Sequence, residues 1–220
     1  MMDICYGCGE LRADKTIDPS GPYAICPVCS HRHPFRQLPL LVVGGASGTG
    51  KTAVGQVLLG TLEEAIVLEG DLLWSEAFNT PRDGYRMFYD TWLRLARNIS
   101  QAGKPVVLLN AGAAIPGSLE PSVQRRYFTR IHYCALVCDE AEMIGRLKRR
   151  PAWRNSADPG FLERNAAFNA WLKANAETSS PPIALLDTTD GSPARTAEKV
   201  REWIRSSLEA ERPRQYYRRG

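Results

Sequence analysis

Residues 45–52 read Gly-Ala-Ser-Gly-Thr-Gly-Lys-Thr and match the pattern G-x-x-x-x-G-K-[ST], which describes a loop that wraps around phosphate groups. Glycines let the backbone turn tightly and bring its N–H groups close to a polyphosphate. The Lys51 ammonium can reach the terminal phosphates, and the Thr52 hydroxyl can ligate Mg²⁺. A helix that begins near Gly50 would point the positive end of its dipole at the same anion.

The context of this loop favours the same interpretation. Residues 38–43 are almost wholly apolar, as in a strand that is buried on both faces of a parallel sheet. Apolar residues recur at helical spacing after the loop, namely Ala53, Val54, Val57, Leu58 and Leu62. A glycine-rich turn that binds no nucleotide is the alternative. It is disfavoured because the motif and its context agree independently.

Bulk composition limits the class of protein. The 220 residues suffice for one α/β core with a small appendage, and 44% hydrophobic with 24% charged residues is typical of soluble globular proteins. The chain has no apolar run of about 18–20 residues and no basic segment followed by an apolar one at its start. We therefore expect no membrane partner and a cytoplasmic location. The net charge of +4 permits anionic ligands without requiring nucleic acid.

The first 37 residues carry two C-x-x-C pairs that are separated by seventeen residues, which fits a zinc ribbon. Two such knuckles supply four thiolates for a closed tetrahedral site with no position open for chemistry. In a cytoplasmic protein, structural disulfides are the weaker alternative, and a redox pair is weaker still. The predicted ligands of a structural zinc ion are Cys5, Cys8, Cys26 and Cys29.

The other Cys and His residues have simpler interpretations. His31 and His33 follow the second knuckle and could substitute as ligands, but they are expected at the surface, because four cysteines already complete the site. Cys134 and Cys138 lie in an apolar run and are expected to be core thiols. This N-terminal segment could pack on the core or on another subunit, or it could recognise nucleic acid or protein. We favour the packing role, because residues 1–37 lack an aromatic stacking platform beyond Tyr6, Tyr23 and Phe35. The basic residues of this segment are Arg12, Lys15, Arg32, His33 and Arg36.

From residue 38 onward, strand and helix patterns alternate, which predicts a parallel sheet. The expected strands are 38–43, 65–68, 106–109, 133–138 and 183–186. One expected helix begins after residue 50. The others cover 82–101, part of 120–130, 140–150, 158–176 and 193–211. The fold class is therefore α/β, with a zinc-ribbon module at 1–37, a core domain at 38–211 and a basic tail at 212–220 that we expect to be frayed.

Residues 38–210 resemble the small P-loop kinases, such as gluconate kinase, chloramphenicol phosphotransferase and the nucleoside and nucleotide kinases. The resemblance implies a three-layer P-loop NTPase sandwich with a five-stranded parallel sheet. It also implies transfer of the γ-phosphoryl group of ATP, with Mg²⁺, to an alcohol. The residues expected to bind nucleotide are Gly45, Ala46, Ser47, Gly48, Thr49, Gly50, Lys51, Thr52 and Arg146, with Lys51 also catalytic and Thr52 the magnesium ligand.

Two further segments carry the resemblance. Residues 68–74, Leu-Glu-Gly-Asp-Leu-Leu-Trp, are similar to the end of the second strand in gluconate kinase-like enzymes, which makes Asp71 the expected catalytic carboxylate. Glu69 is a less favoured substitute, and a helix N-cap is a compatible role for Asp71. Residues 146–154 are similar to the lid, where Arg150 and Arg154 would stabilise the transferring charge. A solvated basic helix end is the alternative.

Loops after the other strands complete the expected site. Residues 186–191 would border the adenine, with a polar loop that caps the last helix as the alternative. Asn110 stands where many P-loop NTPases have an acidic residue, and gluconate kinase-like members lack that acid too. The acceptor would lie between Asp71, the helix from residue 82 and the loop after 109, where Arg82 and Arg86 could hold an anionic group. Nearby aromatic residues, mostly expected in the core, are Trp74, Phe78, Tyr85, Phe88, Tyr89 and Trp92.

The sequence thus predicts an ATP- and Mg²⁺-dependent kinase that phosphorylates a small molecule such as a nucleoside, sugar or sugar acid. A polynucleotide 5′-hydroxyl kinase, gripping its strand with the ribbon and the basic tail, is a first alternative, so nucleic acid is a possible but less favoured partner. A non-catalytic ATP-binding regulatory module that acts through the ribbon is a second. The oligomeric state stays open.

Overall fold

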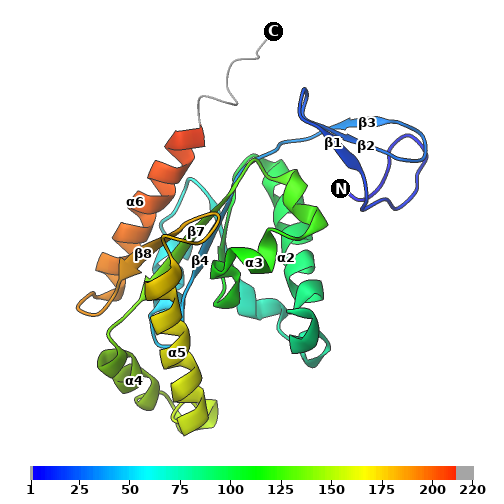
Figure 1. Ribbon diagram of the computed structural model, residues 1–220. Helices are drawn as coiled ribbons and strands as arrows, with labels where there is room; N and C mark the ends of the chain where they lie inside the picture. The colour runs from blue at the N-terminus through cyan, green and yellow to red at the C-terminus, as the bar shows by residue number, and fades with distance from the viewer. Residues whose placement is uncertain (1, 212–220) are drawn as a thin grey trace.

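A computed structural model describes residues 2–211, and a five-stranded parallel sheet in the order β5-β6-β4-β7-β8 runs through its centre (Figure 1). The basic tail at 212–220 lies outside the described residues. Every residue of β4 and β6 is buried, as expected for central strands covered on both faces. The strands are β4 (Leu40–Gly44), β5 (Ile66–Glu69), β6 (Val106–Leu109), β7 (Ile131–Val137) and β8 (Ile183–Asp187).

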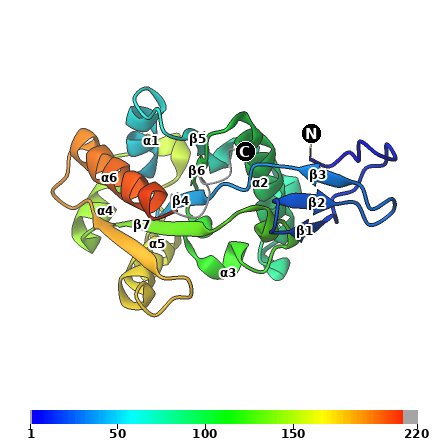
Figure 2. The ribbon, with the colours of Figure 1, turned by 90° about the horizontal axis from the view of Figure 1, so that it is seen from above.

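Helices cover both faces of the sheet and make three layers, which confirms the predicted fold class (Figures 1 and 2). Alternate residues of each strand point to opposite faces. Leu40 and Val42 pack with the layer of α2 (Arg86–Ile99), α3 (Pro116–Leu119) and α5 (Pro159–Asn175). Leu41 and Val43 pack with α1 (Lys51–Leu59) and α6 (Pro193–Glu211). Helix α4 (Glu140–Lys148) packs against α5.

Two predicted helices are shorter than expected. The helix expected from residue 82 begins at Arg86, because Tyr85 adopts a left-handed backbone conformation with φ of 60° that no α-helix accommodates. In the expected segment 120–130, only Val123–Tyr127 is helical, as a 3₁₀ turn. Other short 3₁₀ turns are Gly70–Leu73, Glu76–Phe78, Pro81–Asp83, Ser100–Ala102, Gly112–Ala114 and Ala152–Arg154.

The N-terminal module is a small antiparallel sheet of β1 (Thr16–Asp18), β2 (Tyr23–Ile25) and β3 (Arg32–Pro34). It sits beside α2, at the far end of the molecule from α6 (Figure 2). Lys15, one of the basic residues of the module, is fully buried. Its ammonium donates hydrogen bonds to the backbone carbonyls of Met2 at 2.8 Å and Ile4 at 2.9 Å, so it ties the N-terminal segment together.

Polar and apolar contacts join this module to the core. Asp3 forms an ion pair with Arg97 of α2, whose side chain is 1% exposed. The Arg97 guanidinium also lies 4.0 Å from the ring centroid of Tyr127, a cation–π distance. Tyr127 packs in one apolar cluster with Met2, Ala24 and Phe35 of the module. The module is therefore packed on the core, as the favoured interpretation of the sequence held.

Within residues 2–211, no helix combines the length and the apolar character that are needed to cross a membrane.

The Asp3–Arg97 pair provides a test of this packing. We expect Asp3→Ala to lower the free energy of unfolding by about 3 kcal/mol, because it leaves a buried guanidinium without its partner. The measurement is urea-induced unfolding of the zinc-loaded protein, followed by tryptophan fluorescence. Asp14→Ala is the matched control, since Asp14 pairs with Arg12 at the surface of the same module. Equal unfolding midpoints for the two variants would contradict a stabilising role for the buried pair.

Candidate functional site

The phosphate loop lies between the end of β4 and Lys51, the first residue of α1. Its first glycine is required by close packing, because a Cβ at Gly45 would lie 2.3 Å from the carbonyl oxygen of Leu136 in β7. Gly45 and Gly50 also have φ values of 129° and 97°, which side chains other than glycine rarely tolerate. The sheet and the loop thus hold the start of α1 at the carboxyl edge of the strands.

Lys51 lies over the loop that precedes it. Its ammonium donates hydrogen bonds to the carbonyls of Gly45 at 2.7 Å and Ala46 at 3.0 Å. Burial lowers its pKa to about 8, although the nearby carboxylates of Asp71 and Glu69 act in the opposite direction. An arriving polyphosphate would add negative charge at this ammonium and favour its protonated form.

A cleft of about 400 Å³ opens at the phosphate loop and brings the predicted residues together. The carboxyl ends of parallel strands meet at one edge of the sheet, which places Glu69 and Asp71 beside the loop although β6 separates β4 from β5. The arginines of the expected lid enter from α4 and the segment after it. The residues lining the cleft are Ser47, Gly48, Gly50, Lys51, Thr52, Ala53, Gln56, Glu69, Asp71, Ala111, Arg146, Arg150 and Arg154.

The three arginines of the expected lid differ in their contacts, and Arg154 lies 5.3 Å from the ring centroid of its neighbour Trp153. Arg146 is held by backbone carbonyls, donating to Thr188 at 2.8 Å and Thr189 at 2.9 Å, and it pairs with Glu142 at 2.9 Å. It therefore joins α4 to the loop after β8, beside the nucleotide cleft. The Arg150 guanidinium has no hydrogen-bond or ion-pair partner within the part of the chain that the structure describes, and burial lowers its pKa. Its donors are available for an anion in the cleft.

Two asparagines on α5 were not predicted as part of the site. The Asn165 side-chain oxygen accepts a hydrogen bond of 2.7 Å from the amide of Ser47 in the phosphate loop. One turn later, Asn169 exchanges two hydrogen bonds with the backbone of Cys138 at the end of β7. The sequence signal that could have identified Asn165 and Asn169 is their spacing of four residues on a helix that follows the expected lid. Their partners, however, are about thirty residues or more away in sequence.

A second cleft of about 530 Å³ adjoins the first, and Asp71 and Ala111 line both. The expected acceptor site lies at this position, but one expectation is wrong: neither Arg82 nor Arg86 lines the cleft. The first turn of α2 instead directs Arg86 into a separate groove that Arg94 and Ala13 also line. The lining residues of the second cleft are Asp71, Trp74, Tyr85, Phe88, Tyr89, Asn110, Ala111 and Gly112.

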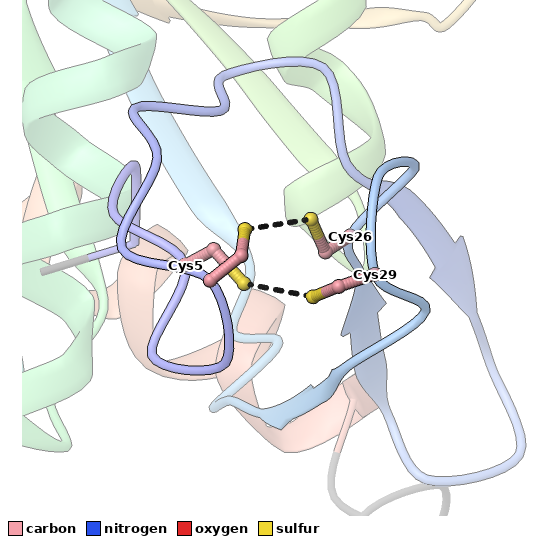
Figure 3. Close-up of side chains that lie close together, drawn as sticks. Cys5, Cys26 and Cys29 are labelled. Carbon is pink, nitrogen blue, oxygen red and sulfur yellow. Dashed lines mark hydrogen bonds between the residues drawn. The ribbon is translucent and has the colours of Figure 1, made fainter.

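The four predicted zinc ligands converge in the N-terminal module, and Figure 3 labels three of them, Cys5, Cys26 and Cys29. Their sulfur atoms lie within 4.8 Å of one another, with Cys5 and Cys29 at 3.5 Å and Cys8 and Cys26 at 3.9 Å. A tetrahedral zinc site with Zn–S bonds of about 2.3 Å requires sulfur atoms about 3.8 Å apart. The cluster therefore fits one zinc ion. None of these cysteines lines either cleft.

His33 corrects a prediction about this cluster. We expected it at the surface, but it is buried, and its Nε2 lies 3.4 Å from the Cys5 sulfur. Strand pairing is the reason: His33 is the middle residue of β3, opposite Ala24 of β2, and alternation turns its side chain inward. A ring nitrogen at this distance orients the sulfur ligand from outside the cluster. His31 is exposed, as expected, and Cys134 and Cys138 are buried in the core.

Comparison with known protein families and with curated protein sequences finds no match. Several solved structures share the fold. A gluconokinase from Sinorhizobium meliloti has 16% identity over 82% of this chain and 100% of its own, with a TM-score of 0.53. A tunicamycin resistance protein from Deinococcus radiodurans has 16% identity over 77% and 96%, with a TM-score of 0.53. A sugar kinase from Janibacter has 16% identity over 79% and 98%, with a TM-score of 0.51. The chain therefore has the fold of P-loop kinases.

The cysteine cluster predicts one zinc ion per chain. We expect purified protein to contain about one molar equivalent of zinc, and Cys26→Ser to reduce it strongly, because three thiolates do not complete the tetrahedral site. Elemental analysis of the purified proteins provides the measurement. Cys134→Ser, which changes a buried thiol of the sheet, is the control and should keep its zinc. Equal zinc contents in the two variants would rule out the predicted ligand set.

Proposed function

We propose that this protein is an ATP- and Mg²⁺-dependent phosphotransferase that moves the γ-phosphoryl group to an alcohol of a small molecule. The observation that supports this most strongly is the position of Asp71, which lines both the phosphate-loop cleft and the aromatic cleft. A carboxylate shared by two adjoining clefts is suited to orient an acceptor in one toward a phosphate in the other.

On the nucleotide side, Lys51 and the amides of the phosphate loop would hold the phosphates. The oxygen atoms of Thr52, Glu69 and Asp71 line the same cleft and suit Mg²⁺, which prefers oxygen ligands, with Thr52 as the direct ligand. Bound Mg²⁺ neutralises part of the charge on the β- and γ-phosphates. Arg146, fixed to the loop after β8, would border the nucleotide.

On the acceptor side, Asp71 would accept the hydrogen bond of the attacking hydroxyl and take its proton. Local packing fixes the turn that carries it, because the indole N–H of Trp92 donates to the Gly70 carbonyl at 3.0 Å. Gly70 itself is pressed against Asn110, since a Cβ there would lie 2.7 Å from that side chain. Asp71 is therefore presented from a well-supported turn, as a positioned base requires.

The lid would stabilise the charge that moves during transfer. A planar guanidinium suits the equatorial oxygens of a transferring phosphoryl group, and both Arg150 and Arg154 line the cleft. Catalysis would rest mainly on positioning and electrostatics. We also propose that the zinc ion is structural, since its four cysteines leave no open coordination position.

Replacement of Asp71 separates this proposal from a non-catalytic ATP-binding module. We expect Asp71→Asn to lower kcat by about 100-fold or more, because general-base assistance contributes on that scale. The dissociation constant for Mg²⁺-ATP should stay within about threefold of the original, because the phosphate loop is intact. Turnover is measured against a panel of nucleosides, sugars, sugar acids and short oligonucleotides, and ATP binding by calorimetry.

Glu76→Gln is the matched control for this variant, since Glu76 is an exposed acid five residues further on that lines neither cleft. Turnover with oligonucleotides alone would support a polynucleotide kinase instead. Tight ATP binding with no acceptor-dependent turnover by the original protein would contradict the proposed function.

Two neighbouring arginines test the lid. Arg150 lines the cleft, whereas Arg149 points to solvent and pairs with Glu142 at 3.3 Å. We expect Arg150→Ala to lower kcat by about 100-fold or more, because it removes a cation that would face the transferring phosphoryl group. Arg149→Ala should change kcat little. Steady-state kinetics with saturating Mg²⁺-ATP measures both, and equal losses would show that the lid acts through overall charge and not through Arg150.

A further inference from the structure

The second cleft combines an aromatic wall with a single charged residue. Three of its aromatic rings form a continuous wall: Trp74 lies 5.4 Å from Phe88 and 6.0 Å from Tyr85 between ring centroids. Phe88 is 2% exposed and fixed in the core, whereas Trp74 is 50% exposed. An exposed indole on a rigid aromatic base offers a flat surface for a planar ligand.

Backbone geometry holds this wall in place. Tyr85 has a left-handed backbone with φ of 60°, a conformation that costs free energy for a residue with a side chain. Its amide donates to the Asp83 side chain at 3.0 Å and to the Thr80 carbonyl at 3.1 Å, which maintains the turn. The turn brings the Tyr85 ring into the cleft beside Trp74. Strained backbone next to a cleft is typical of a functional position.

The charge of the cleft is the second observation. Asp71 is the one charged residue among its lining residues, and no Lys or Arg of residues 2–211 lines it. A carboxylate or phosphate on the acceptor would therefore approach Asp71 with no cation in the cleft to compensate it, and the repulsion would weaken binding. The cations of the site, Lys51 and the lid arginines, line the adjoining phosphate cleft.

The polar groups of the cleft are suited to an uncharged ligand. The Asn110 side-chain oxygen accepts from the Ala113 amide at 3.1 Å, so its NH₂ group is the part that it can offer to a ligand oxygen. The Tyr89 hydroxyl lies against Gly112, where a Cβ would be only 2.2 Å from it, and closes that end of the cleft. A volume of about 530 Å³ is sufficient for a small ring compound with an alcohol arm.

From these contacts we propose that the acceptor is an uncharged compound that joins a planar ring to an alcohol, with the chemistry of a nucleoside, and that sugar acids are rejected. The ring would stack on Trp74 and its alcohol would face Asp71. This inference rests on the proposed function, which it narrows to one class of acceptor.

The test compares acceptors that differ in one property each, using the full zinc-loaded chain. Uridine is planar and neutral, glucose is neutral without a planar ring, and gluconate is anionic. Binding is measured by calorimetry with a saturating non-hydrolysable ATP analogue present, so that uridine is kept from the nucleotide cleft. Phosphorylation is measured separately with ATP. We expect uridine to bind at least tenfold more tightly than either of the other compounds.

Variants connect this preference to the aromatic wall. Trp74→Ala should weaken uridine binding about tenfold and leave ATP binding unchanged, because it removes the stacking surface. Trp74→Arg should strengthen gluconate binding at least tenfold by supplying the missing cation. Trp171→Ala is the matched control, since Trp171 is an exposed tryptophan of α5 that lines neither cleft.

The possible outcomes separate the two proposals. Uridine that binds in a Trp74-dependent way but receives no phosphoryl group would uphold the acceptor class and overturn the phosphotransferase activity. Gluconate that binds more tightly than uridine and is phosphorylated would uphold the phosphotransferase activity and overturn the acceptor class. An absence of binding by all three compounds, or uridine binding that Trp74→Ala leaves unchanged, would overturn the inference about the acceptor.

Discussion

The contact between the phosphate loop and β7 is the constraint on which the rest of the site depends. Gly45 passes so close to the Leu136 carbonyl that a Cβ would be 2.3 Å from it, so the loop can turn there only with glycine. This turn directs the start of α1 across the carboxyl edge of the sheet. The remaining strands then bring their own loops to the same edge, since all five strands run parallel.

Helix α2 connects two parts of the molecule that the sequence separates. Its first half contributes Phe88 and Tyr89 to the second cleft, and its second half contacts the N-terminal module through Arg97. The N-terminal module and the wall of the second cleft therefore contact opposite ends of one helix, while none of the module's cysteines lines either cleft.

Several features of the site could be predicted because their signals are local. The glycine pattern, the apolar run before it and the two C-x-x-C pairs depend on residues that are close in sequence. The lid arginines share a helical spacing, and Asp71 follows a strand. One mistake concerns side-chain direction: His33 is a polar residue of a small module, and strand pairing turns it inward. The burial of Lys15 likewise depends on the path of the N-terminal segment, whose carbonyls accept its hydrogen bonds.

The sequence alone determined the α/β class, the phosphate loop and the four clustered cysteines, because hydrophobic periodicity and short motifs reflect local geometry. Tertiary structure alone decided which side of α2 faces the second cleft, and so excluded Arg86 from its lining. It also decided that Asn165 contacts Ser47 across 118 residues of sequence and that Asp71 lies between two clefts. These facts depend on how distant segments pack together, and packing is a property of the whole chain that no local pattern contains.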